Sequence, residues 1–155
     1  MSHILTKAIA REAIEMVRPM LTAKILRSEL AGGRPNLHIV VLEPGSKEIL
    51  CEESFGDDRS TWSHPYAEIA RRKAWLCQRT GMVARNVQKD ASWLYIAGDT
   101  RYVGGVIENG LVVAASGLQD YLDEMISWMV LSAIQGLCRD YIAKIDDDTA
   151  PDFFG

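Results

Sequence analysis

The sequence lacks the features that mark several common protein classes. Its three cysteines, Cys51, Cys77 and Cys138, are widely spaced and form no CxxC pair. This indicates reduced thiols rather than a disulfide framework or a zinc site. No stretch approaches the ~20 consecutive apolar residues of a membrane span. The first residues carry charges and no apolar run of signal-peptide length, so we expect a cytoplasmic protein with no membrane partner.

An excess of basic charge is also missing. The chain has 17 lysines and arginines against 21 aspartates and glutamates, for a net charge of -4. Nucleic acids and anionic membranes bind through basic faces, so neither is an expected partner. The motifs GxSxG, GxGxxG and HExxH and the P-loop are absent as well. The matching hydrolase, Rossmann, zincin and NTPase interpretations therefore have no support.

The length and composition favour one domain. The chain has 155 residues, of which 48% are hydrophobic, and this is enough for a single packed core. We assign that domain to residues 1–145. Residues 146–155 begin with three aspartates and are interpreted as an acidic C-terminal tail.

The stretch from Tyr102 to Glu124 organises the rest of the prediction. Two β-prone runs, Val103–Ile107 and Leu111–Ala115, flank Asn109-Gly110. Asn-Gly between two such runs predicts a tight hairpin, because both turn residues must take positive φ. A helical pattern follows, from about Gln119 to Ile145.

This last helix is apolar on more than one side, which indicates that it is buried on more than one side. One side can pack on the sheet. The other side is expected to pack on a second copy of the protein, which predicts a homo-oligomer built through the C-terminal helix.

Upstream, the pattern predicts a helix capped by Thr6 and kinked or divided at Pro19. Its buried stripe is expected to be Ile9, Ala13, Met16 and Met20. A second helix starts at Ser63-His64-Pro65 and ends at Gly81, a common C-terminal stop.

Three further strands are expected. The run Leu37–Leu42 is apolar at nearly every position, which is typical of a central strand. Glu48–Ser54 is its return strand, and Trp93–Ala97 is a third. Two hairpins with helices beside them predict an α/β protein with an antiparallel sheet. We expect a three-layer α/β/α arrangement with about five strands.

The order of short motifs resembles the GlcG/HbpS-like family, also called the haem-degrading domain family. The motifs are Leu5-Thr6, Ile69–Ala74, Gly104-Gly105, Asn109-Gly110, Ser116-Gly117 and Asp123-Glu124. The resemblance implies a profilin-like α/β/α fold and homo-oligomers. For some members it also implies haem-related or corrinoid-related roles.

The sequence departs from the family pattern at a few places. The first hairpin carries Glu43-Pro44-Gly45 where the family usually has Asp-x-x-Gly, and Val106-Ile107 follow the double glycine where the family usually has proline and an aliphatic residue. These departures lie around the expected pocket rather than in the core. The ligand implied by the resemblance therefore stays open between haem and another small molecule.

Lys73 and Glu124 are the candidate catalytic residues. Lys73 falls on the same side of its helix as Ile69 and Cys77, so its stem is expected to be partly buried. A partly buried lysine can have a lowered pKa and act as a base, or it can bind an anion. The alternative is a lysine that extends to solvent or forms an ion pair with Glu124.

Five residues are candidate ligand-binding residues. Gly104 and Gly105 within a strand allow either a bulge or the close approach of a ligand. His64 and Tyr66 are of types that ligate haem iron, although both can equally be surface residues. Arg72 belongs to a basic strip that is either solvated or the rim of an anion site.

The sequence supports two main function classes, and a third is kept as a further alternative. The first is a homo-oligomeric binding module for a small ligand, with haem as one candidate cofactor and no metal site of its own. The second is a cofactor-independent enzyme for a small organic acid or carbonyl substrate, with Lys73 as acid/base or anion-binding group. The third is a purely structural subunit, suggested by the apolar breadth of the last helix.

Overall fold

A computed structural model describes residues 3–145 and 151–154. Its centre is a four-stranded antiparallel sheet in the order β2 (Ile49–Phe55), β1 (Leu37–Leu42), β4 (Leu111–Ser116) and β3 (Gly105–Glu108). Most of the acidic segment predicted at the C-terminus, including Asp146–Asp148, lies outside the described residues.

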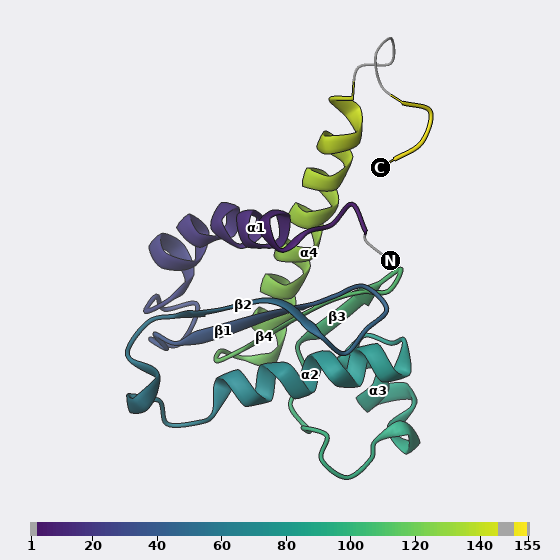
Figure 1. The fold of residues 1–155 in the computed structure, drawn as a ribbon. Coiled ribbons are helices and arrows are strands. Elements are labelled where there is room, and N and C mark those ends of the chain that lie inside the picture. The colour runs from purple at the N-terminus through teal and green to yellow at the C-terminus, as the bar shows by residue number, and fades with distance from the viewer. Residues whose placement is uncertain (1–2, 146–150, 155) are drawn as a thin grey trace.

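Helices cover both faces of this sheet, which confirms the three-layer α/β/α prediction (Figure 1). Helices α1 (Lys7–Met20) and α4 (Asp120–Ala143) pack on one face. Helix α2 (Tyr66–Thr80) packs on the other, with the short helix α3 (Ala84–Asp90) beside it. Gly81 ends α2 in the left-handed conformation, as expected for a glycine stop.

Strand β1 is central, as its sequence predicts. It pairs with β2 on one side and β4 on the other, and all six of its residues are buried. Successive side chains alternate between the faces: Ile39 and Val41 join the core beneath α1 and α4, while Val40 and Leu42 join the core beneath α2. A strand buried on both faces has no polar side, which is why LHIVVL shows no alternation.

The hairpin between β3 and β4 is also confirmed. Asn109 and Gly110 have φ values of 50° and 82°, so both turn residues take the positive φ that Asn-Gly predicts. Strand β3 starts at Gly105 rather than at Val103, because Gly104 has a φ of 137° and bends the chain away from the ladder.

Helix α1 begins at the predicted cap, where the Thr6 hydroxyl accepts a hydrogen bond from the Ile9 amide at 3.2 Å. The chain stays α-helical past Pro19 and changes to a π-helical turn at Leu21–Ile25. The predicted buried stripe is partly wrong, because Met16 and Met20 are exposed. The buried residues of α1 are Ala10, Ala13, Ile14 and Val17.

The predicted strand at Trp93–Ala97 is wrong, and the sheet has four strands rather than five. The segment forms a 3-10 turn at Ser92–Leu94, and a second turn follows at residues 97–98. Side chains satisfy its backbone instead of a neighbouring strand: Arg79 donates to the Leu94 carbonyl at 3.0 Å, and the Ile96 amide donates to Asp99 at 2.8 Å. Trp93 is 79% exposed, so the apolar run is not a core strand.

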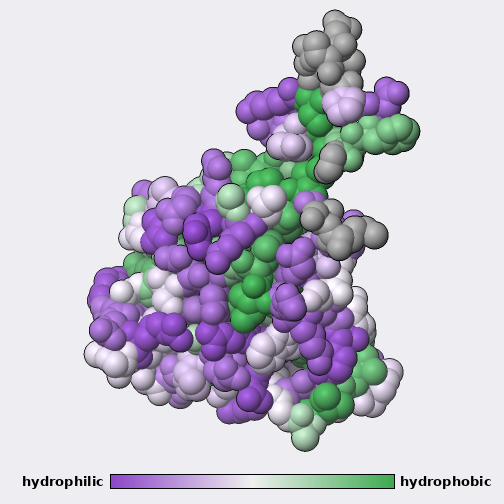
Figure 2. All heavy atoms as spheres, in the orientation of Figure 1, coloured by the Kyte–Doolittle hydropathy of each residue, from purple (hydrophilic) through white to green (hydrophobic). Residues whose placement is uncertain are grey.

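Helix α4 extends beyond the sheet, and its C-terminal part projects from the body (Figure 1). Figure 2 shows hydrophobic surface along this projection and on the body below it. A groove also lies between α1 and α4, and we call it the α1–α4 face. Its apolar residues include Met16, Met20, Tyr121, Met125, Trp128 and Met129. No helix in residues 3–145 is both long enough and apolar enough to cross a membrane.

Candidate functional site

A cavity of about 440 Å³ lies where β4 ends and the N-terminal parts of α2 and α4 come together. Four chain segments supply its lining, within residues 34–36, 63–73, 102–103 and 116–123. This volume is within the range of small-molecule sites, which is about 300–1,000 Å³. The cavity brings together side chains that are far apart in the sequence.

A buried ion pair forms one wall of the cavity. The Lys73 ammonium donates to Asp123 Oδ2 at 3.0 Å and to the Ala115 carbonyl at 2.9 Å. The side chains of Lys73 and Asp123 are 1% and 3% exposed. Asp123 Oδ1 accepts a further hydrogen bond from the Leu118 amide at 3.0 Å. Burying two charges costs several kcal/mol each unless they are paired and hydrogen-bonded, so this pair holds α2, β4 and α4 in one arrangement.

Burial shifts the pKa values of this pair toward each other. Loss of hydration raises the pKa of the Asp123 carboxyl to about 6, against the opposing effect of the Lys73 charge. Loss of hydration likewise lowers the pKa of the Lys73 ammonium, against the opposing effect of Asp123. Burial thus disfavours the charged form of both groups, and their mutual attraction opposes this effect.

The double glycine makes room for the pair. A Cβ atom on Gly104 would lie 2.7 Å from Asp123 Cβ and 3.1 Å from Lys73 Nζ. A Cβ atom on Gly105 would lie 2.9 Å from Cys77 Sγ. Ser127 on α4 also donates to the Gly104 carbonyl at 2.7 Å. The two glycines thus allow α2 and α4 to approach β3 closely, and neither is among the residues that line the cavity.

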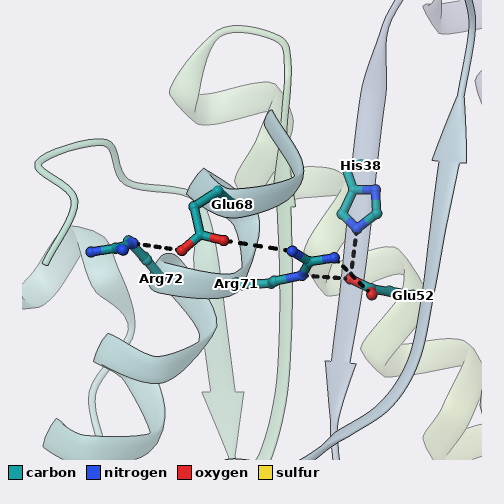
Figure 3. Close-up of polar contacts among 5 residues, drawn as sticks. All are labelled: His38, Glu52, Glu68, Arg71 and Arg72. Carbon is teal, nitrogen blue, oxygen red and sulfur yellow. Dashed lines mark hydrogen bonds and ion pairs between the residues drawn. The ribbon is translucent and has the colours of Figure 1, made fainter. Parts of the chain in front are cut away.

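A second polar network lies on the same side of the sheet (Figure 3). Arg71 donates to both carboxylate oxygens of Glu52, at 2.9 and 3.0 Å, and His38 Nε2 lies 2.9 Å from the same carboxylate. Hydrogen bonding from Arg71 lowers the pKa of Glu52 to about 2. Burial lowers the pKa of His38, which keeps the imidazole neutral near pH 7.

The network continues outward along α2. Glu68 lies 3.5 Å from Arg71 and accepts from Arg72 at 2.8 Å, and Arg72 also donates to the Gly98 carbonyl at 2.6 Å. These contacts tie α2 to β1 and β2 on one side and to the 92–99 segment on the other. In the part of the chain that the structure describes, no three His, Cys, Asp or Glu residues are grouped as a metal site.

Comparison with known proteins finds similar proteins among the solved structures only. No protein-family model matches the sequence, and no curated protein is significantly similar to it. Among solved structures, Klebsiella pneumoniae ORFY of the DUF336 family has a TM-score of 0.58 at 16% identity, over 84% of this chain and 90% of that one. This chain has the GlcG/HbpS-like fold.

Two HbpS structures are similar to the same extent. One has a TM-score of 0.55 at 21% identity, over 85% of this chain and 91% of HbpS. The other, a double mutant of Streptomyces reticuli HbpS, has a TM-score of 0.54 at 20% identity, over 85% of this chain and 88% of that one. The fold expected from the motif order is therefore confirmed.

Within the GlcG/HbpS-like fold, the predicted site residues fall in different places. Lys73, His64 and Tyr66 line the cavity. His64 is at its exposed side, and its ring centroid is 5.9 Å from that of Tyr66. Arg72 is not among the residues that line the cavity, and it donates instead to Glu68 and to the Gly98 carbonyl.

Glu124 is not beside Lys73, so the expected pairing of these two residues is wrong. Glu124 accepts from Arg85 at 2.9 Å, and the neighbouring Asp123 takes the place beside the lysine. The sequence holds a signal for this choice. Asp123 shares a helical stripe with Ile126, Val130 and Ile134, all of which are buried, whereas Glu124 is outside that stripe.

Proposed function

We propose that this protein is a homo-oligomeric GlcG/HbpS-like domain that binds a small molecule in the cavity beside Lys73 and Asp123. The observation that carries the proposal is the ion pair itself, which is almost fully buried and still borders an open cavity. A structural ion pair needs no adjoining space, whereas a binding site combines apolar walls with a few fixed polar groups. Here Ile69, Val103 and Leu118 supply the apolar walls.

A cavity-filling variant tests this proposal. Ile69→Trp places an indole in the cavity, while Ile49→Trp adds the same group at a strand position outside it. Wild-type protein and both variants are screened against a small-molecule library by NMR chemical-shift perturbation. We expect hits that perturb residues 63–73 and 116–123, with binding lost in Ile69→Trp and kept in Ile49→Trp. A screen without any hit in the cavity overturns the proposal.

Haem is a narrower form of the same proposal. His64 and Tyr66 are residue types that ligate haem iron, both line the cavity, and Arg34 at the same cavity can pair with a propionate. A bound haem would supply an iron with redox chemistry that the side chains lack. Hemin titration distinguishes this form: a Soret shift that is lost in the His64→Ala/Tyr66→Phe double variant supports it, and no shift at stoichiometric hemin excludes it.

An enzyme is the second candidate, favoured by the opposite pKa shifts of Lys73 and Asp123. In this version Lys73 acts as acid/base or anion-binding group toward a small organic acid or carbonyl substrate. Asp123, rather than Glu124, is the carboxylate placed to exchange a proton with it. Lys73→Ala should abolish turnover of any substrate found, while Glu124→Gln should not. An unchanged rate in Lys73→Ala excludes this role.

The homo-oligomer part of the proposal rests on the α1–α4 face. Met16, Met20 and Tyr121 are 59%, 47% and 65% exposed, and they belong to one groove. Contiguous exposed apolar surface is a mark of an interaction site. We expect light scattering at micromolar concentration to give a multiple of the chain mass, reduced by Met125→Glu in the groove. A monomeric wild-type protein would contradict this part alone.

A further inference from the structure

The charged side chains around the cavity differ in whether they have an ion-pair partner. Lys73 and Asp123 are paired deep in its wall. Arg34 also lines the cavity, is exposed, and forms no ion pair with any residue in 3–145 or 151–154. A guanidinium offers a planar fork that matches a carboxylate. Asp120 lines the same cavity and repels a carboxylate, so an acidic ligand group is expected on the Arg34 side.

The buried pair has hydrogen-bonding capacity to spare. An ammonium group has three N–H donors, and Lys73 uses two of them, toward Asp123 and Ala115. A carboxylate offers about four acceptor positions, and Asp123 uses three of them, toward Lys73 and the backbone amides of Leu118 and Gly117. A ligand hydroxyl could therefore accept from Lys73 and donate to Asp123 at the same time. A carbonyl oxygen could only accept, and a methylene could do neither.

We propose that the cavity takes a small hydroxy acid with a short apolar side chain. The carboxylate binds Arg34, the hydroxyl group binds between Lys73 and Asp123, and the apolar side chain packs on Ile69, Val103 and Leu118. The assignment rests on the proposed function, since it names the ligand class of that same cavity. It goes further by giving each part of the ligand its own partner in the chain.

A matched series of three acids tests the assignment. The probes are 2-hydroxy-4-methylpentanoate, its 2-oxo analogue and 4-methylpentanoate, which differ only at the second carbon. Binding is measured by calorimetry near pH 7. We expect the hydroxy acid to bind most tightly and the oxo acid less tightly. The unsubstituted acid should bind about tenfold or more weaker than the hydroxy acid, because it leaves the buried polar groups unmatched.

Arg34→Gln tests the carboxylate contact without disturbing the core, since Arg34 is an exposed residue outside the helices and strands. The variant should weaken binding of all three acids by about tenfold or more and leave their order unchanged. Arg139→Gln, which removes an exposed arginine from α4, is the matched control and should bind like wild type. Thermal unfolding of both variants should match that of wild type.

Each result bears on the assignment. The predicted order, together with a loss in Arg34→Gln alone, supports it. Equal affinity across the series, or equal effects of the two arginine variants, overturns it. If none of the acids binds while another library compound or hemin occupies the cavity, the ligand class is wrong and the proposed function stands. If nothing binds in the cavity at all, both fail.

Discussion

The two faces of the sheet carry different kinds of surface. On the α2 side, buried or half-buried charges are paired: Arg71 of α2 pairs with Glu52 of β2, and Lys73 of α2 reaches Asp123 of α4. On the α1–α4 face, the groove between the helices is apolar, and its methionines reach the surface. Paired buried charge fixes a geometry, whereas exposed apolar area gains free energy only when something covers it. The proposed binding site lies with the buried ion pairs, and the proposed oligomer interface lies at the apolar groove.

Breaking the buried pair should have the largest effect. Asp123→Ala leaves the Lys73 ammonium buried without a counter-charge, and we expect it to lower the free energy of unfolding by about 3–5 kcal/mol. Urea unfolding checks this value. The double variant Lys73→Met/Asp123→Leu should recover much of the loss, because it removes both charges. Equal losses in the single and double variants would show that packing, not charge, dominates at this site.

The second-largest effect is expected from a substitution at Gly104. Gly104→Ala sets a methyl group against Asp123 and Lys73 and imposes an unfavourable φ, for a loss of about 2–3 kcal/mol. Gly136 on α4 is the matched control, since a Cβ there meets no atom within 4 Å. Gly136→Ala should raise stability by about 0.5–1 kcal/mol through helix propensity. Thermal or chemical unfolding of both variants tests the opposite signs.

The Glu52 network should show its effect through pH. The folded pKa of Glu52, about 2, is below its ordinary value of 4.5, so its stabilising effect is present above pH 4.5 and is lost as pH falls toward 2. We expect Glu52→Gln to lower the free energy of unfolding by about 1–3 kcal/mol at pH 7. The difference in unfolding free energy between Glu52→Gln and wild type should disappear between pH 4.5 and pH 2. A difference that does not change with pH would mean that the loss comes from side-chain packing and not from the Glu52 charge.

The smallest effect is expected on the α1–α4 face. Met16→Gln/Met20→Gln changes exposed side chains, so the unfolding free energy measured in dilute monomer should stay within about 0.5 kcal/mol of wild type. Ile14→Gln on the buried side of the same helix should cost several times more, because it buries an amide. Urea unfolding at low protein concentration separates the two cases. A large loss in the double variant would mean that these methionines support the monomer.

Patterns within one element were enough to predict most of the fold. The unbroken apolar run Leu37–Leu42 predicts a strand buried on both faces, and Asn109-Gly110 predicts a turn that needs two positive φ values. The apolar composition of Trp93–Ala97 predicts a strand, and this prediction is wrong. Whether a strand forms depends on a free neighbour in the sheet, and here Arg79 and Asp99 satisfy that backbone instead.

The site was predictable only in part. Helical phase indicates that Lys73 points inward, and the structure buries it. Which carboxylate meets it depends on the rotation of α4, and a shift of one residue turns a helix by about 100°. The buried stripe Ile126, Val130 and Ile134 includes Asp123 and not Glu124, so this part of the site could have been found from helical phase. Arg34 could not be singled out, because only the folded chain brings residues 34–36 to the same cavity as α2 and α4.

Helix α4 joins the two faces mechanically. Its 24 residues form one uninterrupted helix, about 36 Å long at 1.5 Å per residue. Asp123 lies near its N-terminal end and Tyr141 near its C-terminal end. One unbroken helix therefore carries both the carboxylate that pairs with Lys73 and the side chains of the projecting end, with no loop between them.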